Sequence, residues 1–173
     1  DAPLGLKTEK DHIKTDYVPG NYDTDAAYDY KTNLEGIYAV GDVIGPPWLA
    51  HVASEEAILC IERIAWKAGK LDHEPIPMDY SVIPGCTYCQ PQVASVGYTE
   101  QALKEKGLKK GEDYEVGKFP FTALGKAIAS HHTDGFCKII RRLPHGEILS
   151  AHIMGDQATE LIPHLPPAPR LAT

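Results

Sequence analysis

The sequence predicts an α+β protein in which an antiparallel sheet with flanking helices follows a strand–helix segment of α/β character. After residue 80, extended segments outnumber helical ones, and a tight turn over residues 143–146 joins two of them as antiparallel neighbours. Before residue 72, a strand expected over residues 37–40 leads through a Gly-Asp turn into a helix over residues 49–67. The change of pattern places a domain boundary near residues 72–80.

Composition narrows the class of protein. The chain has 173 residues, 43% of them hydrophobic, which suffices for one or two small domains with a core. Its net charge of −7 argues against a nucleic-acid binder, because phosphate contacts need a basic face. Apolar runs are too short for a helix that spans a membrane. The four cysteines suggest no disulfide framework, so we expect an intracellular, reducing compartment such as the cytoplasm.

The first 35 residues are polar and rich in turns, with one short strand expected near residues 12–17. The Asp- and Tyr-rich run over residues 17–30 is interpreted as a solvated loop. No signal-peptide pattern follows Asp1. Because Asp1 is not a natural start, we expect the chain to be a piece of a longer protein.

The Gly41-Asp42 turn is the first candidate binding feature. A buried strand over residues 37–40 would deliver the carboxylate at its carboxyl end, where open α/β sheets bind ligands. Gly41 would let a bulky ligand approach the backbone, and Asp42 would accept hydrogen bonds from it. From the residues alone, an ordinary turn role for Asp42 is an equally good interpretation, since Gly-Asp is also turn chemistry.

A helix is predicted to start after the Gly-Pro-Pro turn at residues 45–47 and to end at Gly69. Its core face is predicted from apolar residues at spacings of three and four. These are Ala53, Ala57, Ile61, Ile64 and Ala68. The following residues 71–78 contain two prolines and are expected to form a linker.

The second half of the chain alternates between extended segments and short helices. A helix is expected from a threonine cap at Thr99 to Lys106, with Gly107 ending it, and a last helix starts near Gln157. The expected extended segments are residues 82–83, 86–88, 93–98, 114–121, 136–142 and 147–154.

Six segments follow one another along the chain, at residues 32–43, 48–51, 83–88, 91–97, 117–121 and 133–138. In this order they resemble motifs of the FAD-dependent pyridine nucleotide-disulfide oxidoreductases, and among these the C-terminal portion of the dihydrolipoamide dehydrogenases. Residues 32–43 resemble the second FAD motif of that family, and residues 48–51 follow at its spacing, with Trp48 where the family usually has Met. The segments that resemble its interface domain are residues 83–88, 91–97, 117–121 and 133–138. The resemblance covers roughly residues 30–162.

This resemblance implies a division of the chain and a cofactor site. It implies a remnant of the NAD/FAD-binding region over residues 1–75, an interface domain over 76–162 and a Pro-rich non-family tail over 163–173. Asp42 would bind the ribityl chain of FAD, and the helix start would direct its positive end at the flavin. A capping role is the alternative for His51. The cofactor-binding residues expected in this way are Gly41, Asp42, Trp48, Leu49, Ala50 and His51.

The parent reaction implied is FAD-mediated oxidation of dihydrolipoamide with reduction of NAD. The implied partners are a second copy, through residues 80–162, and the lipoyl domains of 2-oxo acid dehydrogenase complexes. The sequence lacks the family's Gly-rich dinucleotide turns, its Cys-x4-Cys pair and its His-Pro…Glu segment. We therefore assign no catalytic residue, including His164, and expect no turnover from this chain alone.

Three alternatives stay open. The chain could be a stand-alone, non-catalytic dimerisation or binding module, or part of another flavin disulfide reductase such as glutathione or mercuric reductase. A metal or thiol-redox role for Cys86 and Cys89 is disfavoured, because residues three apart in a strand point to opposite faces with Cα atoms ~10 Å apart. Zinc would also need a second pair of ligands, and residues 131–132 are interpreted as a solvated turn, so we predict no metal site.

Overall fold

The computed structural model describes residues 5–17 and 28–165. The chain divides into two compact units, Asp1–Tyr80 (unit 1) and Ser81–Thr173 (unit 2). Residues 18–27 of the Asp- and Tyr-rich run and residues 166–173 of the Pro-rich tail lie outside the described part. The helices among the described residues are too short or too polar to span a lipid bilayer.

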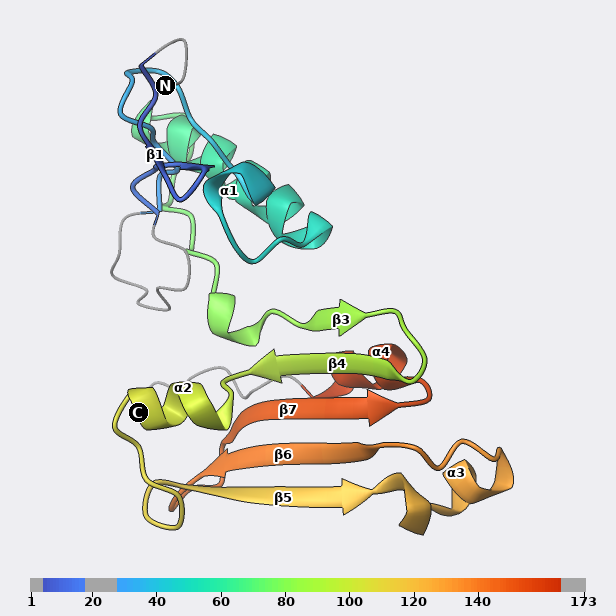
Figure 1. Ribbon diagram of the computed structural model, residues 1–173. Helices are drawn as coiled ribbons and strands as arrows, with labels where there is room; N and C mark the ends of the chain where they lie inside the picture. Colours follow the sequence, from blue (N-terminus) through green and yellow to red (C-terminus); the bar gives the residue numbers. More distant parts are fainter. Residues whose placement is uncertain (1–4, 18–27, 166–173) are drawn as a thin grey trace. The chain divides into compact units, whose positions relative to one another are not determined.

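Unit 1 is built on one long helix, α1, Ala50–Lys67 (Figure 1). A small hairpin, β1 (Thr8–Glu9) and β2 (His12–Ile13), precedes it, so the strand expected over residues 12–17 is only two residues long. A 3-10 helix, η1, follows at Gly41–Ile44.

The strand predicted over residues 37–40 does not form. The segment makes a single antiparallel bridge, between Lys31 and Tyr38. The Thr32 amide and hydroxyl both donate to the Ile37 carbonyl, at 3.0 and 2.8 Å, and close a tight loop. Ile37 is 39% exposed rather than buried. The prediction was wrong because the apolar run has the pattern of a strand, but its backbone pairs with the segment around Lys31 through one bridge only.

The buried face of α1 also differs from the predicted one. Ala57 and Ile61 are exposed, the latter by 65%, while Ala53 and Ile64 are half-buried. The apolar count failed because two members of the true face are charged residues whose partners lie far away in sequence. The buried residues are Val52, Glu56, Leu59, Cys60 and Arg63.

The carboxyl end of α1 forms as predicted. Ala68 is the C-cap, and Gly69 adopts the left-handed φ of +68° that a residue with a side chain takes at a cost. The Gly69 amide donates to the Trp66 carbonyl and the Lys70 amide to the Ala65 carbonyl, both at 2.9 Å. This pair of bonds is the Schellman motif, which satisfies the last carbonyls of the helix.

Both ends of the Asp- and Tyr-rich run belong to the core of unit 1. Tyr17 is 6% exposed and Tyr30 is fully buried, which corrects the prediction that they lie in a solvated loop. They pack with Ile44, Leu59 and Cys60. The predicted linker is attached to the same unit, because the Tyr28 hydroxyl donates to the Pro75 carbonyl at 3.1 Å.

Unit 2 contains a five-stranded sheet in the order β3-β4-β7-β6-β5, and every neighbouring pair is antiparallel (Figure 1). The predicted fold class is therefore confirmed, including the hairpin of β6 and β7. Residue 82, expected to be extended, belongs instead to the 3-10 helix η2, Tyr80–Val82. The strands are β3 Gly85–Thr87, β4 Gln92–Gly97, β5 Tyr114–Pro120, β6 Phe136–Arg142 and β7 Ile148–Gly155.

Short helices flank this sheet. In α2, Glu100–Glu105, the Thr99 hydroxyl accepts the Ala102 amide at 3.1 Å, and Gly107 follows the C-cap with a φ of +82°, as predicted. The sequence did not predict η3 (Phe121–Ala123) or α3 (Gly125–Ala129). The last helix, α4, covers only Ala158–Leu161 before the 3-10 helix η4, Ile162–His164, which contains Pro163.

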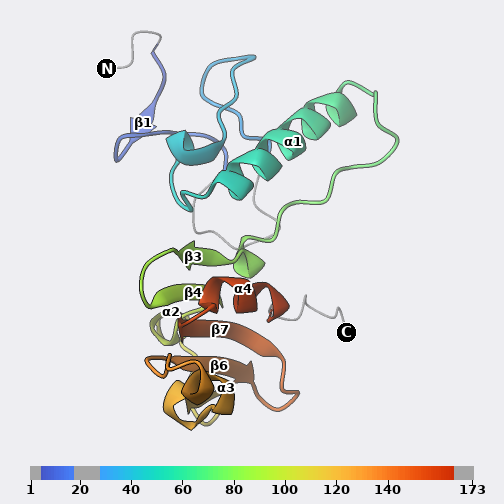
Figure 2. The same cartoon turned by 90° about the vertical axis from the view of Figure 1, so that its right-hand side faces the viewer.

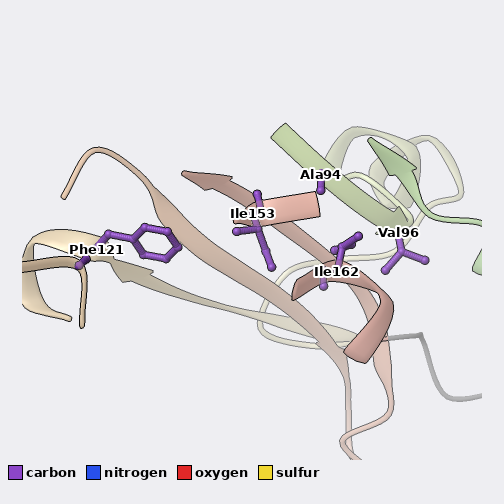
Figure 3. Packing of buried hydrophobic residues seen from close by; sticks show 8 residues of the cluster. Ala94, Val96, Phe121, Ile153 and Ile162 are labelled. Carbon is purple, nitrogen blue, oxygen red and sulfur yellow. The ribbon is translucent and has the colours of Figure 1, made fainter. Parts of the chain in front are cut away.

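The core of unit 2 lies between one face of the sheet and α4 (Figure 2). Ala94 and Val96 of β4 and Ile153 of β7 belong to one cluster with Ile162, and the Phe121 ring points toward Ile153 from the far end of this cluster (Figure 3). A second cluster, formed by Leu103, Tyr114 and Ile140, joins α2 to β5 and β6. Alternation along the strands supplies both clusters.

Candidate functional site

The turn at Gly41 is pressed against α1. Gly41 is buried with a φ of +76°, and a Cβ atom built on it would lie 2.9 Å from Cβ of Ala53. Its amide donates to Oε2 of Glu56 at 2.5 Å. A side chain at position 41 would thus strain the backbone and push the turn off the helix.

Polar and aromatic groups are exposed just beyond this turn. Asp42 and Val43 are exposed at the start of η1, and Trp48, Ala50 and His51 are exposed around the start of α1. Leu49 is the N-cap, and no side chain of the described residues caps the helix there. The first amides of α1 therefore keep their donors for another acceptor.

Trp48 packs beside the β1–β2 hairpin. Its ring stacks on that of His12, with centroids 6.0 Å apart and planes at 17°, yet Trp48 remains 62% exposed. A cleft of about 490 Å³ between the hairpin and the carboxyl end of η1 includes His12, Ile44 and Pro46 in its lining. Among the aromatic residues close to Asp42 in sequence, Trp48 is the most exposed.

A buried polar chain supports the turn from behind. The Tyr80 hydroxyl donates to Oε1 of Glu56 at 2.7 Å, and the Tyr30 and Tyr80 hydroxyl oxygens are 3.0 Å apart. Burial raises the pKa of the Tyr80 phenol above its ordinary value, and burial does the same to the pKa of Tyr30. The two phenols thus stay protonated and keep the hydrogen atoms that link Tyr30, Tyr80 and Glu56.

An ion cluster fixes the other half of α1. Arg63 donates through Nε to Oδ1 of Asp29 at 2.8 Å and through Nη1 to Oε1 of Glu74 at 2.5 Å, and Lys67 bonds the second Asp29 oxygen. The Arg63 guanidinium also lies 4.2 Å from the Tyr28 ring centre. Burial acts to raise the pKa of Asp29, but the hydrogen bonds and charges of Lys67 and Arg63 outweigh it and lower that pKa.

The structure thus brings the predicted residues Gly41 and Asp42 onto the first turns of the helix that carries Ala50 and His51. Sequence reasoning missed Glu56, Tyr30 and Tyr80, which hold this arrangement from the buried side. One signal could have revealed Glu56, since it lies at helical spacing from Val52 and Leu59.

The remaining candidates lie apart from this region in sequence. All four cysteines are free thiols, with Cys86 in β3 and Cys89 in the turn beyond it. His131 and His132 are exposed, as a solvated turn predicts, and Nδ1 of His132 lies 3.0 Å from Oδ2 of Asp156. Within the described ranges, no group of three or more His, Cys, Asp or Glu side chains could hold a metal ion.

The residues around the Gly41 turn fit a flavin nucleotide. The exposed Asp42 carboxylate can accept hydrogen bonds from the hydroxyls of a ribityl chain. The uncapped amides of α1 can donate to carbonyl oxygens, and their dipole favours negative charge. An exposed aromatic face beside these groups suits a planar ring system.

Comparisons with known proteins find similarity to one family. Residues 83–169 match the model of the pyridine nucleotide-disulphide oxidoreductase dimerisation domain, a match that extends past residue 162. A dihydrolipoyl dehydrogenase of Rhizobium etli is 45% identical over 159 residues, which are 92% of this chain and 29% of that protein. A mitochondrial dihydrolipoyl dehydrogenase of Pisum sativum is 44% identical over 133 residues, 77% of this chain and 24% of that protein. The chain therefore spans less than a third of the length of these relatives.

Solved structures show the same fold. LpdA from Mycobacterium tuberculosis matches with a TM-score of 0.65 and 22% identity, over 93% of this chain and 31% of that one. The HOCl-induced flavoprotein disulfide reductase RclA from Escherichia coli matches with a TM-score of 0.69 and 19% identity, over 92% of this chain and 32% of that one.

Proposed function

The chain belongs to the pyridine nucleotide-disulphide oxidoreductase family, and we propose that it is a segment of a dihydrolipoyl dehydrogenase that supplies one wall of the FAD site and a subunit interface. The observation that carries the cofactor role is the Gly41-Asp42 turn, which lies against the start of α1 with its carboxylate exposed. FAD, when bound, would supply the electron-accepting chemistry of such an enzyme.

Each predicted site residue takes a part in this proposal. Asp42 accepts hydrogen bonds from the ribityl hydroxyls, and Gly41 lets the turn lie close to the helix. Amides near Ala50 donate to the pyrimidine end of the flavin. Trp48 lies beside the ring system, and Leu49 and His51 complete the lining.

The domain roles follow the same proposal. Residues 1–75 contribute to the nucleotide-binding region and residues 76–162 form the interface domain, with a homodimer through residues 80–162. In the parent enzyme the partners are lipoyl domains of 2-oxo acid dehydrogenase complexes, and NAD is the second cofactor. The compartment we expect is the cytoplasm or the mitochondrial matrix.

Flavin titration tests the cofactor role. FAD fluorescence is measured as the chain is added, for the native sequence, for Asp42→Asn and for the control Asp72→Asn, an exposed carboxylate in the linker. We expect Asp42→Asn to weaken FAD binding about tenfold, since a charged acceptor is lost, and Asp72→Asn to bind as the native chain does. Equal affinities for all three would overturn the role of Asp42.

Two further measurements test the rest of the proposal. Sedimentation equilibrium should give twice the 18.9 kDa mass of the chain, and a monomer at all concentrations would contradict the interface. The chain contains no Cys-x4-Cys pair, so purified protein should not form NADH from dihydrolipoamide and NAD. A steady rate of NADH formation would show that our assignment of no catalytic residue is wrong.

A further inference from the structure

Glu56 is a buried carboxylate in the second turn of α1, only 2% exposed. Each of its oxygens accepts one hydrogen bond, Oε2 from the Gly41 amide at 2.5 Å and Oε1 from the Tyr80 hydroxyl at 2.7 Å. Both donors are neutral. Burying a carboxylate is costly unless its hydrogen bonds are well made, so these two bonds define where the group can lie.

The hydrogen bond from the Gly41 amide to Glu56 restrains the backbone of the Gly41-Asp42 turn. The amide that donates to Glu56 belongs to the planar peptide between residues 40 and 41, so this bond fixes the orientation of the peptide that enters Gly41, one residue before Asp42. A Cβ atom built on Gly41 would lie 2.9 Å from Cβ of Ala53, so the turn also lies directly against α1. The backbone that carries the exposed Asp42 is therefore held against α1 by buried groups.

The tyrosines hold Glu56 in turn. Tyr80 contacts both Glu56 and the Tyr30 hydroxyl, and its ring stacks on Tyr17 with centroids 4.7 Å apart. Tyr30 is fully buried at a φ of +59°, a conformation rarely adopted by a bulky residue. Such strain persists only where surrounding contacts determine it, and it clusters near functional sites.

We infer that Glu56 is a positioning residue for the flavin site, holding the Gly41-Asp42 turn on α1 while Tyr80 keeps the Glu56 carboxylate in place. The ligand named here rests on the proposed function, whereas the positioning of the turn does not. Removing the Glu56 charge should loosen the turn and lower FAD affinity without any change in the residues that touch the cofactor.

The first arm of the test measures the turn itself, without FAD. Hydrogen exchange of the Gly41 amide is compared in the native chain, in Glu56→Gln and in the matched control Glu55→Gln, an exposed neighbour on the same helix. We expect Glu56→Gln to exchange about tenfold faster at Gly41, since a charge-assisted bond is replaced by a neutral one. The Ile140 amide in unit 2 serves as the reference that should not change.

Tyr80→Phe keeps the inference testable if Glu56→Gln does not fold. It retains the ring and its stacking but removes the hydroxyl that donates to Glu56. Faster exchange at Gly41 in Tyr80→Phe supports the relay. Native exchange at Gly41 in every folded variant overturns the positioning role.

The second arm measures FAD affinity by flavin fluorescence in the same variants and in Asp42→Asn. Weaker binding in both Glu56→Gln and Asp42→Asn, with native binding in Glu55→Gln, supports the inference. Weaker binding in Asp42→Asn alone overturns the role of Glu56 toward the flavin and leaves the proposed function standing. Faster exchange at Gly41 with unchanged FAD affinity in every variant, Asp42→Asn included, overturns the proposed function and supports only the positioning of the turn.

Discussion

Unit 2 packs one alternating face of a sheet beneath α4, whereas unit 1 packs tyrosines and charged groups around a single helix. In unit 2 the buried residues next to α4 are Ala, Val, Ile and Phe, apart from Thr159. In unit 1, Glu56, Arg63 and Asp29 are as well buried as Leu59 or nearly so. The core of unit 2 is therefore stabilised mainly by close packing of apolar side chains, and the core of unit 1 also by a specific set of hydrogen bonds and ion pairs. The two cores should therefore fail under different substitutions.

Backbone crowding in unit 2 predicts the largest effect. Gly135 has a φ of +144°, and a Cβ atom there would lie 2.0 Å from the backbone oxygen of Met154. Gly135→Ala should destabilise unit 2 by about 4 kcal/mol, since strained backbone and a clash with a neighbouring strand add together. This loss is measured by chemical denaturation, with hydrogen exchange of the unit 2 amides as the readout.

Gly117→Ala is the matched control for that substitution. Gly117 lies in β5 of the same sheet, and nothing lies within 4 Å of a Cβ atom built on it. Its change in unfolding free energy should stay within about 1 kcal/mol. Similar losses for both alanines would mean that close packing of the backbone does not define this core.

Charge removal in unit 1 predicts the next effect. Arg63→Leu removes both guanidinium contacts to Oδ1 of the buried Asp29 and leaves this carboxylate to Lys67 and Lys31 at its other oxygen, so unit 1 should lose about 3 kcal/mol. The exposed pair of Arg141 and Glu115 in unit 2 supplies the comparison, and Arg141→Leu should cost less than about 1 kcal/mol. If the two substitutions cost the same, the ion cluster would not be a structural centre of unit 1.

A third pair of variants tests which face of α1 is buried. Leu59→Ala should cost about 2 kcal/mol, because it removes packed methyl groups from the unit 1 core. Ile61→Ala, on the exposed face two residues away, should change stability by less than about 0.5 kcal/mol. The reverse order of losses would restore the face predicted from the apolar spacing.

The same contrast explains what could be predicted from the sequence. The strands of unit 2 were predicted because alternation needs only local residues, and Thr99, Gly107 and Gly69 were predicted because caps are local too. The buried face of α1 was mispredicted, since Glu56 and Arg63 count as polar until their distant partners are known. Asp29 lies 34 residues from Arg63 in sequence, and no periodicity reports such a pairing.

The candidate site follows this division. Gly41 and Asp42 form a local turn motif, so the sequence alone singled them out, although the strand expected before them is absent. Tyr80 lies 24 residues from Glu56, and its bond to that carboxylate depends on where the linker packs. The exposed residues of the candidate site could therefore be singled out from the sequence, and the buried residues that support the turn could not.

The smallest predicted effect is a pH dependence that separates unit 2 from unit 1. His152 is half-buried in β7, and its Nε2 lies 3.3 Å from the Tyr98 carbonyl oxygen. Burial lowers the pKa of His152 below its ordinary value of 6.5, and the nearby Lys138 charge acts in the same direction. The unfolded chain therefore binds this proton more readily than the folded one, so the stability that His152 contributes is present above its unfolded pKa and is lost as pH falls toward the folded pKa.

The pKa of Asp29 is lowered as well, but from an ordinary value of 3.8, so its contribution in unit 1 is lost only in stronger acid. Amide exchange in each unit, measured from about pH 8 to about pH 5 for the native chain and for His152→Gln, separates the two, because only the native unit 2 should weaken relative to the variant over this interval. Parallel profiles for the two proteins would show that burial of the imidazole does not tie the stability of unit 2 to pH.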